Sequence, residues 1–309
     1  MRPRDEALAA KLDSQLTQYS IQLNPLPGIA SQADRSCFIE QLLESIHRVE
    51  YTQVIQRRPI SQSRLDPQSG IFDPLKAALL MDRAGQHDEA CWLVFLSVHF
   101  GKNLKSGWEL PRNFYGKLGM GGIWDWNAVS ADPNAVKIWL ATHQARLIST
   151  GSFGNHRRYQ SIDAHKNGGT GNAIESYIRW VASHGSHRDI ARNIHANHGQ
   201  NPRETFHHMY KELDSVMSFG RLAKFDYLTM LGKLGLAPIE PGSAYMNGAT
   251  GPFEGAKLIF GTPKATTNQL DSWLVDLDAI LGLSFGMQVL EDALCNWQKS
   301  PSYFIQFRG

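Results

Sequence analysis

The amino-acid sequence predicts an all-α protein. Leu occurs 32 times and Val 10 times, a bias that favours helices over strands. Apolar residues recur at helical spacing in several windows, whereas no run alternates between apolar and polar residues as a strand does. No repeat of roughly 20–50 residues indicates a solenoid. We therefore expect one continuous helical body with two lobes and long loops.

Helix faces and helix starts support this fold class. Residues 38–51 place four apolar side chains on one face of a helix. The pairs at 73–74, 132–133 and 201–202 each combine an Asp or Asn N-cap with Pro at the first helical position, so a helix is expected after each. Further helices are expected at 88–100, 171–184, 220–235, 269–282 and 286–299.

The chain is expected to divide into a short arm and one large domain. Residues 1–35 are polar and contain Pro, which predicts an N-terminal arm, and residues 36–309 are expected to form a single helical domain. Two segments of that domain do not fit a helix. Residues 101–130 contain six Gly and three Trp, and residues 151–172 contain five Gly and several basic residues. Long ordered loops in compact domains are more often functional than idle, so we expect binding residues here.

Charge and cysteine content exclude several classes of protein. The formal net charge is +2, so any binding to nucleic acid must use a local basic patch. Three Cys exclude a disulfide scaffold, a four-thiolate zinc site and a four-cysteine iron–sulfur cluster. The twelve His lack ligand spacing and HExxH is absent, so no metal and no cofactor are expected. Without a signal-peptide core or a long apolar run, the expected location is the cytoplasm, away from membranes.

Residues 247–260 (NGATGPFEGAKLIF) have the pattern of a tight turn before an apolar helix. Gly248 and Gly251 frame the turn, and backbone N–H groups there, including that of Thr250, could bind a DNA phosphate. The segment resembles the hairpin of a helix-hairpin-helix, with glycine spacing one residue longer than the usual G-x-G. The alternative is an ordinary turn between two helices.

Asp271 lies 20 residues beyond Gly251. In helix-hairpin-helix DNA glycosylases an Asp at about this offset supports an oxocarbenium-like sugar and positions water, which requires an anion beside developing positive charge. An N-cap or solvated Asp is the alternative interpretation. Glycosylases that also cleave the strand carry a Lys where this chain has Phe253, so we expect base excision alone, with Lys257 as the remaining amine candidate.

Basic residues at two further places could hold phosphate. Arg221 and Lys224 share a helix face, and Asp226 is either a partner of Arg221 or a second active-site acid. In the loop at 151–172, cations stand beside the aromatic ring of Tyr159, a combination suited to phosphate and to an extruded base. The glycines around Thr170 could form another anion site, but no Walker A sequence is present.

Several stretches between about residues 65 and 300 are similar to the alpha-glutamyl/putrescinyl thymine pyrophosphorylase family, clade 3. Each is modest alone, and their order makes the resemblance specific. They are 88–102 (DEACWLVFLSVHFGK), 107–108 (GW), 124–126 (WDW), 158–161 (RYQS), 169–171 (GTG), 176–180 (SYIRW), 219–221 (FGR) and 287–297 (MQVLEDALCNW).

The resemblance implies an enzyme related to helix-hairpin-helix DNA glycosylases that attacks modified phage DNA in bacterial defence. Its target would be a flipped hypermodified pyrimidine, with glucosylated 5-hydroxymethylcytosine as the first candidate, in double-stranded phage DNA. No obligate protein partner is evident. The aromatic residues expected to form the base pocket are Trp108, Trp124, Trp126 and Tyr159. The residues expected to contact DNA are Lys102, Arg157, Arg158, Lys166, Thr170, Arg221, Lys224, Gly248, Thr250, Gly251 and Lys257.

Alternatives stay open for both the catalytic acid and the activity. Asp292, Glu291 and Asp226 are the alternatives to Asp271 as the catalytic carboxylate. The activity in the family name, pyrophosphate chemistry on a thymine adduct, is the second candidate function. A reader that binds modified DNA without catalysis is the third.

Overall fold

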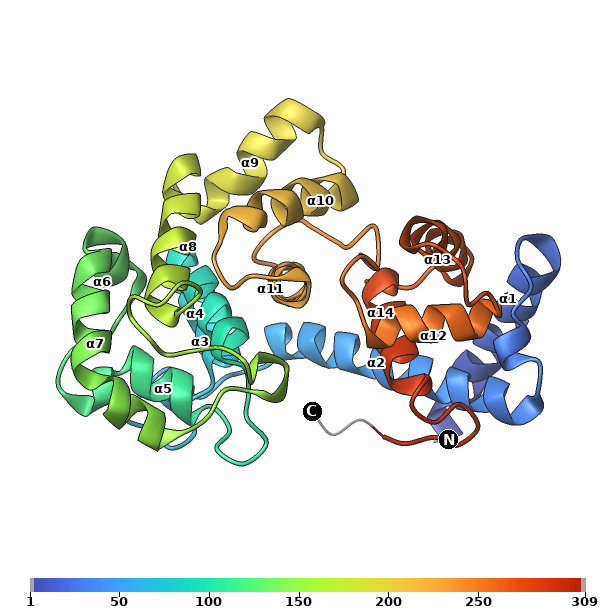
Figure 1. Ribbon diagram of the computed structural model, residues 1–309, viewed down its shortest axis with the longest axis horizontal. Helices are drawn as coiled ribbons and strands as arrows, with labels where there is room; N and C mark the ends of the chain where they lie inside the picture. Colours follow the sequence, from blue (N-terminus) through green and yellow to red (C-terminus); the bar gives the residue numbers. More distant parts are fainter. Residues whose placement is uncertain (1–2, 307–309) are drawn as a thin grey trace. The chain divides into compact units, whose positions relative to one another are not determined.

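The computed structural model describes residues 3–306, and this part of the chain holds fourteen α-helices and no β-strand (Figure 1). The prediction of an all-α protein is confirmed. The chain forms two compact units: Met1–Val54 with Pro241–Gly309, and Ile55–Glu240. Both boundaries fall inside residues 36–309, the stretch expected to be one domain with two lobes. We call these units the terminal unit and the central unit.

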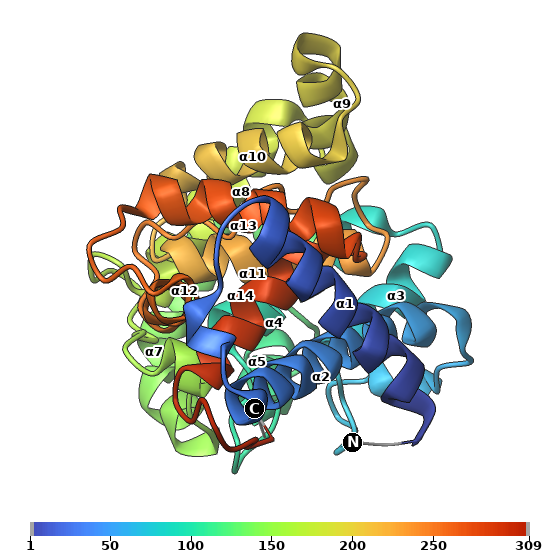
Figure 2. The same cartoon turned by 90° about the vertical axis from the view of Figure 1, so that its right-hand side faces the viewer.

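The terminal unit combines both ends of the chain around one apolar core. Its helices are α1 (Glu6–Gln22), α2 (Gln32–Arg57, whose last turn enters the central unit), α12 (Gly251–Phe260), α13 (Thr267–Leu281) and α14 (Gly286–Trp297). Figure 2 shows α1, which packs against α13. Residues 1–35 were expected to form an arm, but Leu12, Leu16 and Tyr19 of α1 are fully buried in this core. The Tyr19 hydroxyl also donates to the Trp273 carbonyl at 2.9 Å.

Close packing of α12 on α14 explains two glycines of the hairpin-like segment. A Cβ at Gly255 would lie 2.5 Å from the Leu294 carbonyl oxygen, and one at Gly251 would lie 2.7 Å from Cys295 Sγ. Such distances are shorter than van der Waals contact, so a side chain would push the helices apart. At least these two positions therefore serve helix packing.

The central unit is built around the buried helix α4 (His87–Phe100). Every residue of α4 from Glu89 to Phe100 is buried, and α3, α5, α6, α9 and α11 all pack against it. A helix covered on all sides is expected to be apolar nearly all round, and only Glu89, Ser97 and His99 are polar in this buried stretch. The other helices of the unit are α3 (Pro74–Arg83), α5 (Glu109–Tyr115), α6 (Trp126–Ala131), α7 (Pro133–Thr150), α8 (Thr170–His184), α9 (His187–His198), α10 (Pro202–Glu212) and α11 (Arg221–Lys233).

The helix starts predicted from sequence are confirmed. The side chains of Asp73, Asp132 and Asn201 each accept hydrogen bonds from backbone N–H groups of the first turn, at 3.0 Å for Asp132 and 2.9 Å for Asn201 at their shortest. These bonds satisfy donors that the helix itself leaves unpaired. The caps therefore fix where α3, α7 and α10 begin.

The segment 101–130, expected to be irregular, contains the short helices α5 and α6 and is tied to α4 by aromatic residues. The indole N–H of Trp92 donates to the Trp124 carbonyl at 2.7 Å, and the Trp124 N–H donates to the Tyr115 carbonyl at 2.7 Å. These bonds hold the start of α6 beside α4. They position Trp126, the first residue of α6.

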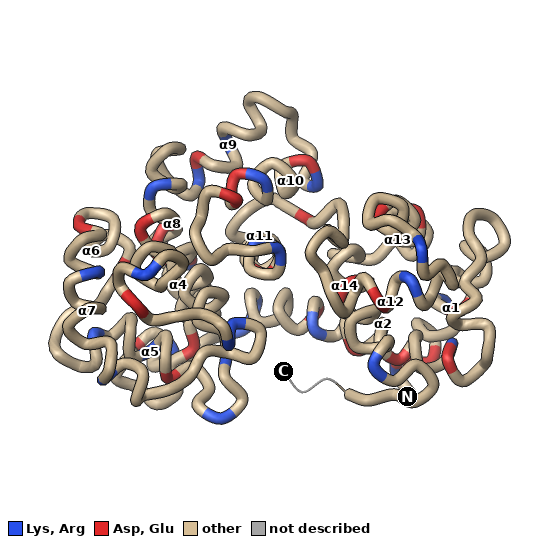
Figure 3. The backbone as a smooth tube through the Cα atoms, in the orientation of Figure 1, with Lys and Arg blue, Asp and Glu red and all other residues tan. Residues whose placement is uncertain are grey.

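Charged residues are spread over both units. Figure 3 shows Lys and Arg positions interspersed with Asp and Glu positions along the helices. No single helix in the described part of the chain is long and apolar enough to cross a bilayer; α13 and α14 reach that length only together, with a bend of 115° between them.

Candidate active site

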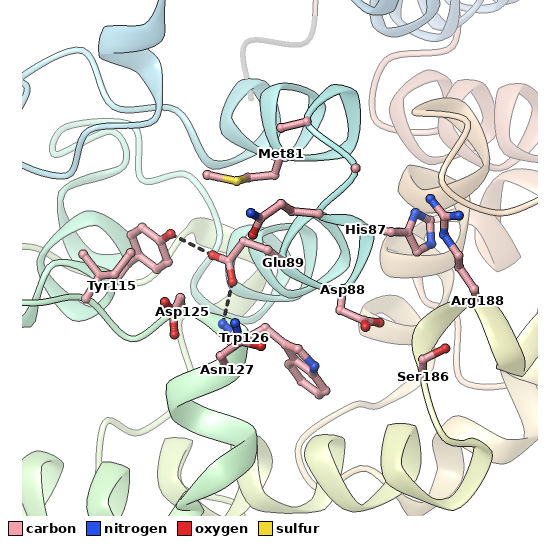
Figure 4. Close-up of a pocket in the computed structure, with 14 residues that line it drawn as sticks. Met81, His87, Asp88, Glu89, Tyr115, Asp125, Trp126, Asn127, Ser186 and Arg188 are labelled. Atoms are coloured by element: carbon pink, nitrogen blue, oxygen red, sulfur yellow. Dashed lines mark hydrogen bonds between the residues drawn. The ribbon is translucent and has the colours of Figure 1, made fainter.

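A cavity of about 560 Å³ opens in the central unit beside the first turn of α4 (Figure 4). Its walls come from the loop before α4, the end of α5, the start of α6 and the start of α9. The lining is mixed, with three carboxyl groups, two side-chain amides and an indole ring. The lining residues are Met81, Ala84, Gly85, Gln86, His87, Asp88, Glu89, Tyr115, Ile123, Asp125, Trp126, Asn127, Ser186 and Arg188.

The carboxyl group of Glu89 is buried against this cavity. Its Oε1 accepts a hydrogen bond from the Tyr115 hydroxyl at 2.7 Å, and its Oε2 accepts one from the Trp126 backbone N–H at 2.5 Å. Burial raises the pKa of Glu89 from its ordinary 4.5 to about 7, an effect that the two donors reduce and the nearby Asp125 carboxylate increases. Glu89 can therefore hold and release a proton at neutral pH.

The carboxyl group of Asp88, the preceding residue, has its pKa shifted in the opposite direction. Its Oδ1 accepts from Nδ1 of the His187 ring at 2.6 Å and from the His187 backbone N–H at 2.9 Å. The bond from the ring is the largest of the influences that hold the pKa of Asp88 below its usual range. Two adjacent carboxyl groups whose surroundings push their pKa values apart are a common feature of acid–base catalysis.

The remaining walls offer a flat ring, amides and a cation. The Trp126 ring lies 4.6 Å from the His187 ring, centroid to centroid, in an edge-on arrangement. The exposed guanidinium of Arg188 has no hydrogen bond or ion pair within residues 3–306, and the same holds for the side-chain amides of Gln86 and Asn127. Such a cavity can stack a planar ligand, hydrogen-bond its edge and hold an anion at the rim.

Of the four aromatic residues expected to form a base pocket, Trp126 lines this cavity. Trp124 is buried, with the Lys117 ammonium 3.9 Å from its ring centre. Trp108 precedes α5, and Lys102 Nζ lies 6.0 Å from its ring centre. Tyr159 is 86% exposed, away from this lining set, with Arg158 at 4.8 Å from its ring.

The hairpin-like segment and Asp271 lie in the terminal unit. Gly248 has a φ of +79°, and Thr250 directly precedes α12. The Asp271 carboxylate accepts from the Ser243 hydroxyl at 2.8 Å and from the Met246 N–H at 3.0 Å. Asp271 thus fixes the loop that enters the turn.

The other carboxylates considered from sequence are also engaged within the protein. In the terminal unit Asp292 accepts from Nε of Arg48 at 3.0 Å and from the Ser45 hydroxyl at 2.9 Å, and Glu291 is buried. In the central unit Asp226 pairs with Arg157 at 3.2 Å. No group of three His, Cys, Asp or Glu side chains within residues 3–306 is placed to hold a metal ion.

Several residues expected to grip DNA act inside the fold. The buried guanidinium of Arg157 donates to the Val98 carbonyl at 2.8 Å as well as to Asp226. The buried ammonium of Lys224 pairs with Asp214, and the buried Thr170 hydroxyl donates to the Ser161 carbonyl at 2.8 Å.

The other cations expected at DNA lie nearer the surface. Lys102, Arg158 and Lys166 are exposed. Arg158 lines a smaller cavity of about 350 Å³. Arg221 lies 5.1 Å from the Phe225 ring, and Lys257 pairs with Glu254 at 2.7 Å.

The acid pair of the cavity was not among the residues singled out for chemistry. Asp88 and Glu89 open the stretch 88–102 that carried the family resemblance, but acids in the first turn of a helix are ordinarily explained by the helix dipole. Their partner His187 is 99 residues away in the sequence. Only the folded structure brings these groups together.

A sequence profile of one family matches residues 33–309, nearly the whole chain. Searches of curated proteins and of solved structures found no match. The resemblance seen in the sequence is confirmed. The chain belongs to the alpha-glutamyl/putrescinyl thymine pyrophosphorylase clade 3 family, whose name implies an enzyme that processes a modified thymine.

Proposed function

We propose that this protein is a monofunctional DNA glycosylase that removes a hypermodified pyrimidine from double-stranded phage DNA, leaves an abasic site and serves in anti-phage defence. The observation that carries the proposal is the pair Glu89 and Asp88 on one cavity, one carboxyl with a pKa of about 7 and one held charged. Family membership directs the proposal toward modified pyrimidines.

Glu89 is suited to be the general acid. When the bond between C1′ and the pyrimidine nitrogen breaks, negative charge develops on the leaving base, and a proton delivered to that base lowers the barrier. A carboxyl with a pKa near 7 is protonated in a large fraction of the molecules at neutral pH and gives the proton up readily. The Tyr115 hydroxyl and the Trp126 N–H then stabilise the carboxylate that remains.

The cavity walls suit a flipped base with a substituent. Trp126 provides a surface for stacking, and the amides of Gln86 and Asn127 can bond the base edge. A volume of about 560 Å³ lies within the range of roughly 300–1,000 Å³ that encloses drug-sized ligands. Glucosylated 5-hydroxymethylcytosine is our first candidate, and a hypermodified thymine is the second.

DNA contacts would come from exposed cations and from backbone groups. Arg188 at the cavity rim, Lys102, Arg158 and Lys166 are the cations available for phosphate. The turn at 247–251 is a further candidate for a phosphate contact. Asp271 is the alternative catalytic carboxylate, because its offset from that turn matches the helix-hairpin-helix glycosylases.

The test is incubation of the purified protein with matched phage DNAs that carry glucosylated hydroxymethylcytosine, unglucosylated hydroxymethylcytosine or ordinary cytosine. Abasic sites are scored by mild alkaline cleavage, and released bases are identified by mass spectrometry. We expect release from glucosylated DNA only, and loss of that release in Glu89→Gln.

Other outcomes would replace this function. Release of a hypermodified thymine from a fourth DNA would keep the glycosylase and change the substrate. Release of pyrophosphate in place of a free base would support the activity in the family name. Tight, modification-dependent binding without any product would support a reader.

A further inference from the structure

We propose that Asp88 is the second catalytic carboxylate of this site, which takes a proton from the attacking water, and that His187, backed by Tyr177 and Tyr227, is the positioning residue that holds it. This inference rests on the proposed function for its chemistry. Its geometry is independent of the substrate.

A line of hydrogen bonds runs from the cavity into the core. His187 Nδ1 is 2.6 Å from Asp88 Oδ1, His187 Nε2 is 2.7 Å from the Tyr177 hydroxyl, and that hydroxyl is 2.8 Å from the Tyr227 hydroxyl. A carboxylate only accepts, so Nδ1 must donate to it. The neutral ring then accepts at Nε2 from Tyr177, whose oxygen accepts from Tyr227. The order of donors is therefore fixed over three bonds and four helices, α4, α9, α8 and α11.

Packing prevents the imidazole from turning away. The His187 side chain is 2% exposed, and Tyr177 and Tyr227 are fully buried. The Trp126 ring lies against His187, and the Phe95 ring stacks on Tyr177 at 3.9 Å. Burial lowers the pKa of His187, so the ring stays neutral and retains this tautomer.

The same contacts leave one oxygen of Asp88 available. Both donors from His187 reach Oδ1, whereas Oδ2 has no hydrogen-bond partner in the described part of the chain. The Asp88 side chain is 37% exposed and lines the cavity. Oδ2 is therefore the atom that can meet a water molecule beside a bound nucleotide (Figure 4).

The chemical step balances with these two groups. The bond between C1′ and the base nitrogen breaks, and its electron pair leaves with the base, which receives the Glu89 proton. The water oxygen bonds to C1′, and its proton passes to Asp88 Oδ2. Return of that proton to Glu89 through solvent restores the enzyme. The net reaction adds one water molecule and needs no other reactant.

Other charged or titratable groups surround Asp88, and the test must take them into account. The cavity lining contributes His87, Glu89, Tyr115, Asp125 and Arg188. Asp82 of α3 pairs with His87 at 2.9 Å, and the buried Cys91 follows on α4.

The geometry can be tested without substrate by NMR. In the wild-type protein, nitrogen-15 shifts should show His187 protonated at Nδ1 and unprotonated at Nε2. The Asp88 carboxyl carbon, assigned with Asp88→Asn, should titrate below the ordinary value of about 3.9. A ring protonated at Nε2, or an Asp88 midpoint at or above that value, would overturn the positioning role.

Two substitutions of His187 distinguish positioning from mere packing. An Asn amide can occupy the place of Nδ1 and keep the donor to Asp88, whereas a Gln amide reaches the place of Nε2 and loses it. We expect His187→Gln to move the Asp88 midpoint and the acid limb of kcat/KM to higher pH, and His187→Asn to restore both. Thermal melting confirms that each variant is folded.

Turnover tests the catalytic role separately. Asp88→Asn is expected to lower kcat about 10²- to 10⁴-fold with little change in KM. Wild-type kcat in Asp88→Asn, together with a strong loss in Glu89→Gln, would overturn the role of Asp88 and leave the glycosylase standing. If wild-type protein releases no base from any DNA, the proposed function fails, while the NMR result still decides the positioning role.

Discussion

The carboxyl groups of Asp271 and Glu89 occupy contrasting surroundings. Asp271 accepts from a hydroxyl and a backbone N–H of the loop that it fixes, in the terminal unit. Glu89 accepts two hydrogen bonds as well, but its burial beside a cavity raises its pKa to about 7. Hydrogen bonds alone therefore do not distinguish a structural acid from a reactive one. Desolvation next to space for a ligand does.

The largest expected effect separates these two residues directly. Glu89→Gln removes the proposed general acid and should lower kcat for base release by about 10²- to 10⁴-fold, with DNA binding retained. Asp271→Asn should stay within about tenfold of wild type, because Asn can still accept at one oxygen. Initial rates of abasic-site formation on saturating modified DNA measure both. The opposite ranking would assign the catalytic role to Asp271.

The pH dependence of stability sharpens the same comparison. In the unfolded chain Glu89 ionises near 4.5, but in the folded protein only near 7. The free energy of unfolding that protonated Glu89 contributes is therefore fully present below pH 4.5. It falls as the pH rises from 4.5 to 7 and is lost above pH 7. The total loss is on the order of 3 kcal/mol. Urea unfolding from pH 4 to 8 measures the free energy of unfolding of wild type minus that of Glu89→Gln. This difference should fall over that range. A difference that does not change with pH would contradict a raised pKa of Glu89.

The aromatic wall of the cavity is tested by Trp126→Ala. This change keeps the backbone N–H that bonds Glu89 and removes the ring available for stacking. Stacking on an aromatic side chain contributes about 1–3 kcal/mol per base, so KM should rise about 5- to 150-fold with a smaller change in kcat. Trp108→Ala, outside the cavity lining, is the matched control. Equal effects of both changes would place the base elsewhere.

The structural role of Asp271 predicts a loss of stability. Asp271→Ala leaves the Met246 N–H without this acceptor and should lower the unfolding free energy by about 1–3 kcal/mol. Denaturant unfolding at pH 7 measures the change. Unaltered stability, combined with lost base release, would indicate that Asp271 serves chemistry and not the loop.

Local signals in the sequence predicted much of the fold but little of the cavity. Caps such as Asp73 and Asn201 act on the next turn of chain, so spacing alone reveals them. The buried face of α1, with Leu12 and Leu16, follows helical spacing but was outweighed by the polar composition around it. The two hydrogen-bond donors to Glu89 lie 26 and 37 residues away, at Tyr115 and Trp126. A carboxyl whose pKa depends on such tertiary contacts has no local signature.

The smallest expected effect concerns the rim of the cavity. Arg188 is exposed on α9, whereas Arg192 on the same helix pairs with Asp189 and lies outside the lining. If Arg188 contacts a phosphate, Arg188→Gln should reduce the slope of the logarithm of the DNA-binding constant against the logarithm of the salt concentration by about 1. It should leave kcat at saturating DNA unchanged. Arg192→Gln should leave the slope as it is. If Arg188→Gln leaves the slope unchanged and weakens the binding of modified DNA only, Arg188 instead bonds the substituent on the base. The reason is that only a phosphate contact releases counterions from modified and unmodified DNA alike.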